Sequence, residues 1–120
     1  MRILGIVARG ATLISMAPVL PAYAEGDFDT AGGFLEEYGD GESLLPRLYI
    51  RGIGEGISVY NALKQSEDGS QFYCPPEKVG LVDGQYVAIL RSFVAKMPDT
   101  KKLPLPVVLL VALQDAFPCQ

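Results

Sequence analysis

The stretch LPRLYIRGIGEGISVYNALKQ, residues 45–65, decides the fold class. Its apolar residues recur in steps of three and four, which is the spacing of one face of an α-helix. Ser43 is a candidate N-cap, and Pro46 lies in the first turn, where its missing N–H costs nothing. We therefore predict a long amphipathic helix whose buried face is formed by Leu45, Tyr49, Ile53, Ile57, Tyr60 and Leu63.

Three glycines interrupt this helix, and each costs about 1 kcal/mol relative to alanine. Gly52 and Gly56 lie four residues apart and flank one stripe, where a second helix could approach closely. The segment also resembles a phosphate-binding glycine loop. However, a dinucleotide fingerprint needs glycine where Ile57 stands, and the G-K-[S/T] of a Walker loop is absent from the sequence. We interpret the glycines as helix-packing positions.

A shorter helix is predicted before this one and a loop after it. Residues 27–38 form the short helix, with Asp29 or Thr30 as its N-cap, although a Gly-Gly pair weakens it. Residues 66–80 form the loop, because they contain a glycine, two consecutive prolines and no helical periodicity.

Two more helices are predicted in the C-terminal part. Asp83 caps the first, which covers about residues 84–97 and stops at Pro98. A polar turn over residues 99–105 leads to the last helix, which starts at Pro106. Four helices without a clear strand predict an all-α domain, a small bundle of about four helices.

The last predicted helix is unusually apolar. Residues 107–113 read VVLLVAL and carry hydrophobic side chains on every face. A helix that is apolar all round lies in the centre of a core or at a partner interface. Its valines would also suit a strand, but the length and the bounding prolines favour a helix.

The N-terminus has the pattern of a secretory signal peptide. Arg2 and Arg9 give a positive start, an apolar stretch follows over residues 11–20, and Ala22 and Ala24 form an A-x-A cleavage site. The alternative is an amphipathic helix of the mature fold. We predict a cleaved signal peptide over residues 1–24, a helical domain over 25–120, export to the periplasm, and no membrane anchor after cleavage.

The two cysteines predict one disulfide. Cys74 and Cys119 are the only cysteines, and an exported domain of this size typically oxidises such a pair. The bond would close a loop of about 45 residues and stabilise the fold by roughly 4 kcal/mol on the chain-entropy model.

Composition argues against several functions. The chain has 14 acidic and 10 basic residues, a net charge of −4 and no basic cluster, which argues against nucleic acid as a partner. Cleavage would remove Arg2 and Arg9, leaving 8 basic residues and a charge of −6. The absence of His removes the usual zinc ligand and the commonest general base.

No catalytic constellation is evident. Acidic residues such as Glu36 and Glu55 are scattered, as expected for a solvated surface rather than a glycosidase pair. Ser58 and Ser92 could meet Lys64 or Lys96 only by an accident of packing. We expect no enzyme activity, no cofactor and no metal.

The C-terminal half carries motifs of a known family. They are FYCPP (residues 72–76), GQ (84–85), MP (97–98), L-x-x-P (103–106) and A-L-x-x-A-F-P-C (112–119), preceded by LYIRG (48–52). Together they resemble the Rap/Tai family, small exported immunity proteins that neutralise peptidoglycan amidase toxins of the type VI secretion system. The resemblance covers most of residues 45–119, and the ending A-L-x-x-A-F-P-C is its most specific part.

The resemblance implies an all-helical fold, commonly a homodimer, that occludes the active site of a toxin and performs no catalysis. Family members typically carry a second cysteine pair. Tyr38 and Pro46 occupy those positions here, so both partners of that disulfide are missing together. The spacing between Cys74 and Gly84 is also about two residues longer than in the family pattern.

Two functions therefore compete. The first is an immunity-type protein whose partner is an amidase effector; the second is a periplasmic structural or stress-related helical protein with no toxin partner. For the first, a protruding loop would fill the enzyme cleft, and the candidate contact residues are Glu67, Asp68, Phe72, Tyr73 and Asp99. For Phe72 and Tyr73 the alternative role is to cover the disulfide.

Overall fold

In the computed structural model, which describes residues 28–76 and 80–120, the chain is helical throughout. The elements are α1 (Ala31–Tyr38), α2 (Leu44–Asp68), α3 (Asp83–Lys96), the 3-10 helix η2 (Pro98–Lys102) and α4 (Leu105–Ala116). Within the described ranges there is no β-strand, only an isolated bridge between Thr30 and Pro104. The predicted all-α bundle of about four helices with one disulfide is confirmed. The predicted signal peptide lies outside the described residues.

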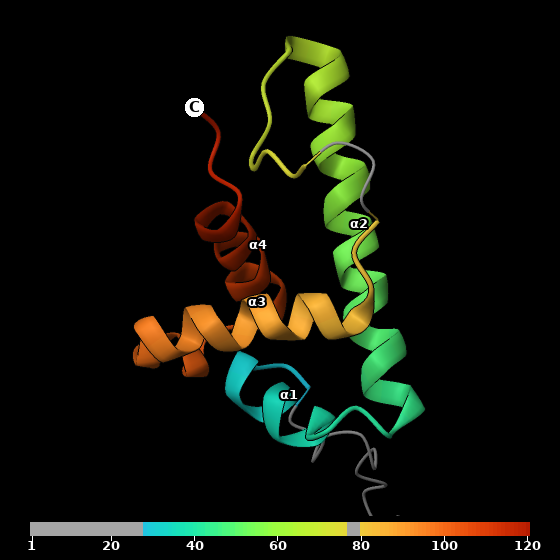
Figure 1. Ribbon diagram of the computed structural model, residues 1–120, viewed down its shortest axis with the longest axis vertical. Helices are drawn as coiled ribbons and strands as arrows, with labels where there is room; N and C mark the ends of the chain where they lie inside the picture. The colour runs from blue at the N-terminus through green and yellow to red at the C-terminus, as the bar shows by residue number, and fades with distance from the viewer. Residues whose placement is uncertain (1–27, 77–79) are drawn as a thin grey trace, which may run out of the picture.

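The helices pack around α4 and α3. Figure 1 shows α2 as a long upright helix, with α3 lying across it, α1 below α3, and α4 above. The core is formed chiefly by α3 and α4, where Leu90, Leu105, Leu109 and Leu113 are fully buried. In the part of the chain that the structure describes, no helix is long and apolar enough to cross a membrane.

Local sequence signals set most helix ends. The Thr30 hydroxyl accepts a hydrogen bond from the Gly33 N–H at 3.1 Å, which confirms the predicted N-cap of α1. Gly69 ends α2 in the left-handed conformation, with φ of 74°. Pro98 follows α3 directly, as predicted, since proline cannot continue the helix.

The face of α2 that packs on the core differs from the prediction. Its buried residues are Pro46, Ile50, Gly54 and Asn61. The predicted stripe was wrong at its ends, because Leu45, Tyr60 and Leu63 are 67%, 61% and 53% exposed, while Tyr49, Ile53 and Ile57 lie at its edges, partly covered. Apolar residues lie on more than one side of α2, so its periodicity did not single out the face that packs on the core.

The glycines of α2 are also used differently. An added Cβ at Gly52 or Gly56 would meet no atom of residues 28–76 or 80–120 within 4 Å, so the close helix approach predicted there is absent from the described part of the chain. Gly54 makes the close approach instead, because a Cβ on it would lie 2.3 Å from Cζ of Tyr86 in α3. A glycine is required where that ring meets the helix backbone.

The predicted cap of α3 also needs correction. Asp83 is the first residue of α3 rather than its cap; the N-cap is Val82, whose N–H donates to Oε1 of Gln85 at 2.9 Å. The Asp83 carboxylate instead accepts hydrogen bonds from the Tyr38 hydroxyl at 2.9 Å and from Nε of Arg47 at 3.1 Å. These two bonds, led by the one from Tyr38, lower the pKa of Asp83.

Helix α4 is central, as expected, but not buried on every side. Leu105, Leu109 and Leu113 lie inside, whereas Val107 and Val111 are 53% and 40% exposed. The apolar run therefore exceeds what residues 28–76 and 80–120 cover.

Candidate functional site

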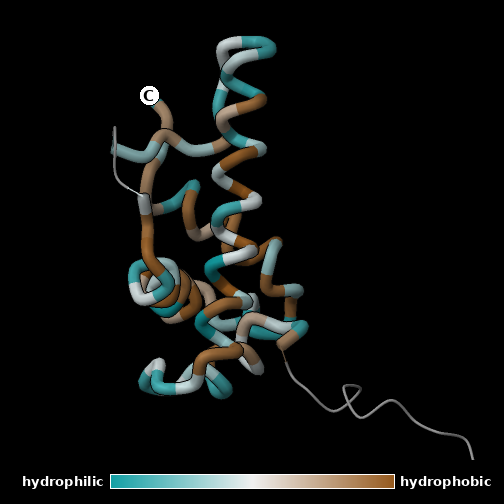
Figure 2. Tube along the Cα trace, turned by 90° about the vertical axis from the view of Figure 1, so that its right-hand side faces the viewer, coloured by the Kyte–Doolittle hydropathy of each residue, from teal (hydrophilic) through white to brown (hydrophobic). Residues whose placement is uncertain are grey.

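The C-terminal end of α2 projects beyond the other helices. In Figures 1 and 2, its upper part stands clear of α1 and α3, and the chain returns along it after residue 68. We call residues 64–73, the last turn of α2 and the returning segment, the tip. Glu67 and Asp68 are exposed there, but they belong to the helix rather than to the loop predicted for residues 66–80.

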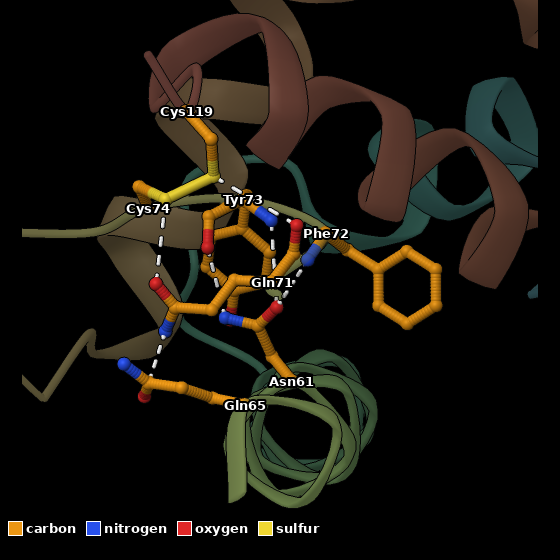
Figure 3. The surroundings of a disulfide bond; sticks show 7 residues. All are labelled: Asn61, Gln65, Gln71, Phe72, Tyr73, Cys74 and Cys119. Carbon is orange, nitrogen blue, oxygen red and sulfur yellow. Dashed lines mark hydrogen bonds between the residues drawn. A yellow bond between two sulfur atoms is a disulfide. The ribbon is translucent and has the colours of Figure 1, made fainter. Parts of the chain in front are cut away.

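Asn61 fastens the returning segment to α2. Its side chain is 3% exposed. Its Nδ2 donates to the Tyr73 carbonyl at 2.9 Å, and its Oδ1 accepts from the Phe72 N–H at 2.7 Å (Figure 3). A buried amide that satisfies backbone groups in this way fixes the segment, since breaking either bond leaves a polar group unpaired.

The disulfide fastens the same segment to the C-terminus. Cys74 and Cys119 are bonded, with Cα atoms 5.0 Å apart, as predicted. The Cys74 N–H also donates to the Phe117 carbonyl at 2.8 Å. Residues 72–74 are thus held from two sides, by Asn61 of α2 and by the segment that follows α4 (Figure 3).

A compact polar turn closes the tip. Asp68 accepts hydrogen bonds from the Ser70 N–H at 2.9 Å and from the Ser70 hydroxyl, and its other oxygen pairs with Nζ of Lys64 at 3.0 Å. These contacts, the Ser70 hydroxyl first, lower the pKa of Asp68 from 3.8 to about 2. Asp68 is therefore ionised across the physiological range, beside the exposed Glu67.

An aromatic cluster lies beside this turn. Phe72 is partly exposed and stacks on Tyr60, with ring centroids 5.4 Å apart. Nζ of Lys64 lies 5.3 Å from the centroid of the Phe72 ring. The tip thus presents a partly exposed aromatic ring, a side chain that is enriched at protein interfaces, beside charged groups of the kind that form a polar rim.

Tyr73 and Asp99 do not share this surface. Tyr73 is 2% exposed and packs in the core next to the disulfide, so its side chain is not accessible to a partner. Burial raises the pKa of its phenol, and a hydrogen bond with Ser58 opposes that shift. Asp99 is exposed in η2, beyond the far end of α3 and away from the tip (Figure 1).

A pocket of about 450 Å³ lies between α2, the segment after Tyr73 and the start of α3. Arg51 and Glu55 supply its charges among the described residues, and they pair with each other at 2.8 Å. Ser58 also lines it, but Lys64, the base it would need, is bonded to Asp68. Lys96 likewise pairs with Asp115, at 2.7 Å, rather than activating Ser92.

Metal-ligating side chains do not gather in the described ranges, where no group of three or more His, Cys, Asp or Glu is placed to hold an ion. What the described part assembles is a rigid, exposed tip. Sequence reasoning missed Asn61 and Ser70, its main polar supports. The one sequence signal for Asn61 was that its amide side chain interrupts the apolar run VYNAL, residues 59–63.

The chain matches no family model, and no curated protein or solved structure is significantly similar to it. The Rap/Tai resemblance stays a hypothesis that rests on the motifs quoted above. Two of those motif segments, FYCPP and A-L-x-x-A-F-P-C, meet at the disulfide.

Proposed function

We propose that this protein is an exported immunity-type protein that binds and inhibits a peptidoglycan amidase effector of the type VI secretion system in the periplasm. The observation that carries the proposal is the tip: an exposed end of α2 whose returning segment is fixed by Asn61 and by the Cys74–Cys119 bond. The motifs that support the family resemblance include both ends of that bond.

A fixed, protruding segment suits the inhibition of an enzyme. Active sites are concave, so a convex segment can enter one and exclude substrate. Because the returning segment is already held in one conformation, binding costs less conformational entropy than ordering a free loop would. Phe72 is the aromatic anchor, and residues around it exclude water from the contact.

Electrostatics favours a basic partner surface. Glu67 is exposed, and Asp68 stays ionised because its pKa is about 2. The chain as a whole carries a net charge of −4. A negative surface speeds association with a positively charged cleft rim and disfavours acidic partners.

The test is a pull-down with the disulfide-bonded protein against extracts of its own cells and of close relatives, followed by a peptidoglycan hydrolysis assay. We expect capture of an amidase whose activity falls to background at a one-to-one ratio. Glu67→Arg and Phe72→Ala should each weaken inhibition at least tenfold. Glu37→Arg, the same charge change on an exposed position of α1, serves as the control.

Either of two results would contradict the proposal: no amidase is captured, or a captured amidase remains fully active. The second candidate, a periplasmic structural or stress-related helical protein without a toxin partner, would then become the working hypothesis.

A further inference from the structure

A buried tyrosine hydroxyl reaches the pocket between α2 and the start of α3. Tyr86 is 3% exposed and lines this pocket, whose volume is about 450 Å³. Within residues 28–76 and 80–120, the Tyr86 hydroxyl has no hydrogen-bond partner, and no fully enclosed side-chain oxygen is left in that state. The hydroxyl therefore opens into the pocket. Because buried polar groups are normally hydrogen-bonded, its partner is water or a ligand that occupies the pocket.

Gly54 explains why the hydroxyl lies there. An added Cβ at Gly54 would be 2.3 Å from Cζ of Tyr86, the atom that carries the hydroxyl group. The polar end of the ring thus rests on the backbone of α2. Arg51, Glu55 and Ser58 follow one another at intervals of four and three residues, which places them on one face of the helix. All three line the pocket, so the Tyr86 hydroxyl and three polar side chains of α2 share one space.

Tyr73 brings a second phenol to the pocket. It is 2% exposed and lies among the lining residues, with a hydrogen bond between its phenol and Ser58. Burial raises the pKa of Tyr73, and it also raises the pKa of Tyr86, where the neighbouring Tyr73 and Glu55 add to the shift. Both phenols therefore keep their protons at physiological pH. A protonated phenol can donate a hydrogen bond to a negatively charged ligand group.

The exposed edge of the pocket carries one positive and one negative side chain among the described residues. The Arg51 and Glu55 side chains are each 60% exposed and are joined by a single contact, Nε to Oε1, at 2.8 Å. The terminal N–H groups of Arg51 and the second carboxylate oxygen of Glu55 form no other bond within residues 28–76 and 80–120. Leu81 and Val82 add apolar surface. The pocket thus combines apolar walls with a few polar groups, as ligand sites do.

We propose that this pocket binds an α-carboxylate that carries an adjacent N–H group and an apolar side chain. A free amino acid and the C-terminal residue of a peptide share this chemistry. The carboxylate accepts hydrogen bonds from the Arg51 guanidinium and the Tyr86 hydroxyl, and the ammonium or amide N–H donates to Glu55. The apolar side chain contacts Leu81 and Val82, which removes apolar surface from water.

Charge and aromatic geometry disfavour other ligands. A phosphate group carries about two negative charges, which the single cation Arg51 would not balance and Glu55 would oppose. A sugar or a nucleobase stacks on an exposed aromatic face, but the tyrosine rings that line the pocket, Tyr73 and Tyr86, are only 2% and 3% exposed. A ligand that places a negative group beside a hydrogen-bond donor matches the Arg51–Glu55 pair.

The inference does not depend on the proposed function. Glu67 and Phe72, the tip residues expected to contact an amidase, are not among the residues that line the pocket. A Tyr86→Phe protein should therefore still inhibit a captured amidase while it binds the carboxylate more weakly. Amidase inhibition and ligand binding are measured separately, and each proposal can fail while the other holds.

The first test is an NMR titration of the isotope-labelled, disulfide-bonded protein with leucine, N-acetyl-leucine and N-acetyl-leucine amide. Leucine represents a free amino acid, N-acetyl-leucine represents a peptide C-terminus, and the amide lacks the negative charge. At least one of the two carboxylates should shift the signals of residues 51–59 and 81–86 saturably, with a dissociation constant of about 1 mM or below. The amide should bind at least about tenfold more weakly. The carboxylate that binds more tightly identifies the source of the ligand.

The second test removes single groups from the pocket. Tyr86→Phe deletes the hydroxyl but keeps the ring on Gly54, and it should raise the dissociation constant about tenfold without lowering the thermal midpoint. Arg51→Gln should weaken binding by at least as much, since it removes the charge that pairs with the carboxylate. Tyr49→Phe deletes a hydroxyl from a residue of α2 outside the pocket, and it should leave the dissociation constant unchanged.

Three results would each overturn the proposal. The first is the absence of saturable shifts with either carboxylate up to about 20 mM, which would leave water as the partner of the Tyr86 hydroxyl. The second is binding of the amide that is as tight as binding of the carboxylates. The third is a Tyr86→Phe protein that binds the carboxylate as tightly as the unmodified protein does.

Discussion

The ring of Tyr86 lies on the backbone of α2 at Gly54, where an added Cβ would be 2.3 Å from Cζ. Tyr86 is 3% exposed, and burial raises the pKa of its phenol. This contact joins α3 to α2, and it fixes which face of α2 turns inward. It thereby leaves Leu45, Tyr60 and Leu63 exposed on the opposite side of α2.

We expect Gly54→Ala to lower the free energy of unfolding by about 1–2 kcal/mol in net. The methyl group overpacks the contact with Tyr86 at a cost of about 2–3 kcal/mol, and the roughly 1 kcal/mol that alanine gains in helix propensity offsets part of that cost. The measurement is urea unfolding at a protein concentration low enough to exclude self-association. Gly56→Ala, which meets nothing within 4 Å, should instead be stabilising; if both variants stabilise, the contact is not as described.

Asn61→Ala should destabilise the fold by about 2 kcal/mol, since it leaves the Phe72 N–H and the Tyr73 carbonyl without their partner. Hydrogen exchange of the Phe72 amide should accelerate together with the fall in stability. Gln65→Ala is the control, because it removes an exposed bond to Gln71 and should change stability by less than about 0.5 kcal/mol. If Asn61→Ala and Gln65→Ala lower the free energy of unfolding equally, Asn61 has no special role in fixing the returning segment.

Cys119→Ser should cost several kcal/mol, about 4 on the chain-entropy model for a 45-residue loop. The midpoint of urea unfolding should fall, and Cys74→Ser should cause a similar loss. Mass spectrometry of the unmodified protein should give a mass two hydrogens below that of the reduced form. An unchanged midpoint would refute the stabilising role of the bond.

The pKa of Asp68 should depend on the hydrogen bonds that its carboxylate accepts from Ser70. Its pKa in the folded protein, about 2, is below its ordinary value of 3.8, so the folded state favours the charged form. The resulting contribution to stability is complete above pH 4 and is lost as the pH falls from about 4 to about 2. An NMR titration should give a midpoint near 2, and Ser70→Ala should raise it. A midpoint near 4 in the unmodified protein would contradict the hydrogen bonds to Ser70.

Processing after Ala24 should give a mature chain that begins at Glu25, because the A-x-A pattern ends there. N-terminal analysis of the periplasmic protein measures this directly. An intact Met1 in that fraction would contradict the predicted cleavage after Ala24. Ala24→Tyr should block cleavage and serves as the matched control.

Much of the fold follows from local signals. Thr30 caps α1, Gly69 ends α2, and Pro98 ends α3, each through the geometry of its own backbone. The Cys74–Cys119 pairing was likewise predictable, since two cysteines permit one bond. The helix ends depend on residues that are close in sequence, and the disulfide depends on the number of cysteines.

The faces of the helices were less predictable. Apolar residues lie on more than one side of α2, so the periodicity allowed either Leu45 or Ile50 to be buried. Packing against Tyr86 selected the face with Gly54, and Leu45 was left outside. The sequence similarly indicated that Asp83 caps α3. Its carboxylate instead accepts hydrogen bonds from Tyr38 and Arg47.

The sequence by itself therefore determined an all-α chain, several of its helix ends and its disulfide, because caps, prolines and cysteines act locally or by number. Tertiary structure alone decided that Tyr73 is buried, that Asn61 supports the tip, and that Gly54 rather than Leu45 faces the core. Those outcomes depend on which surfaces meet across the bundle. Which of two neighbouring faces of a helix is buried depends on the shape of the helix that packs against it. The sequence of one helix does not contain that information.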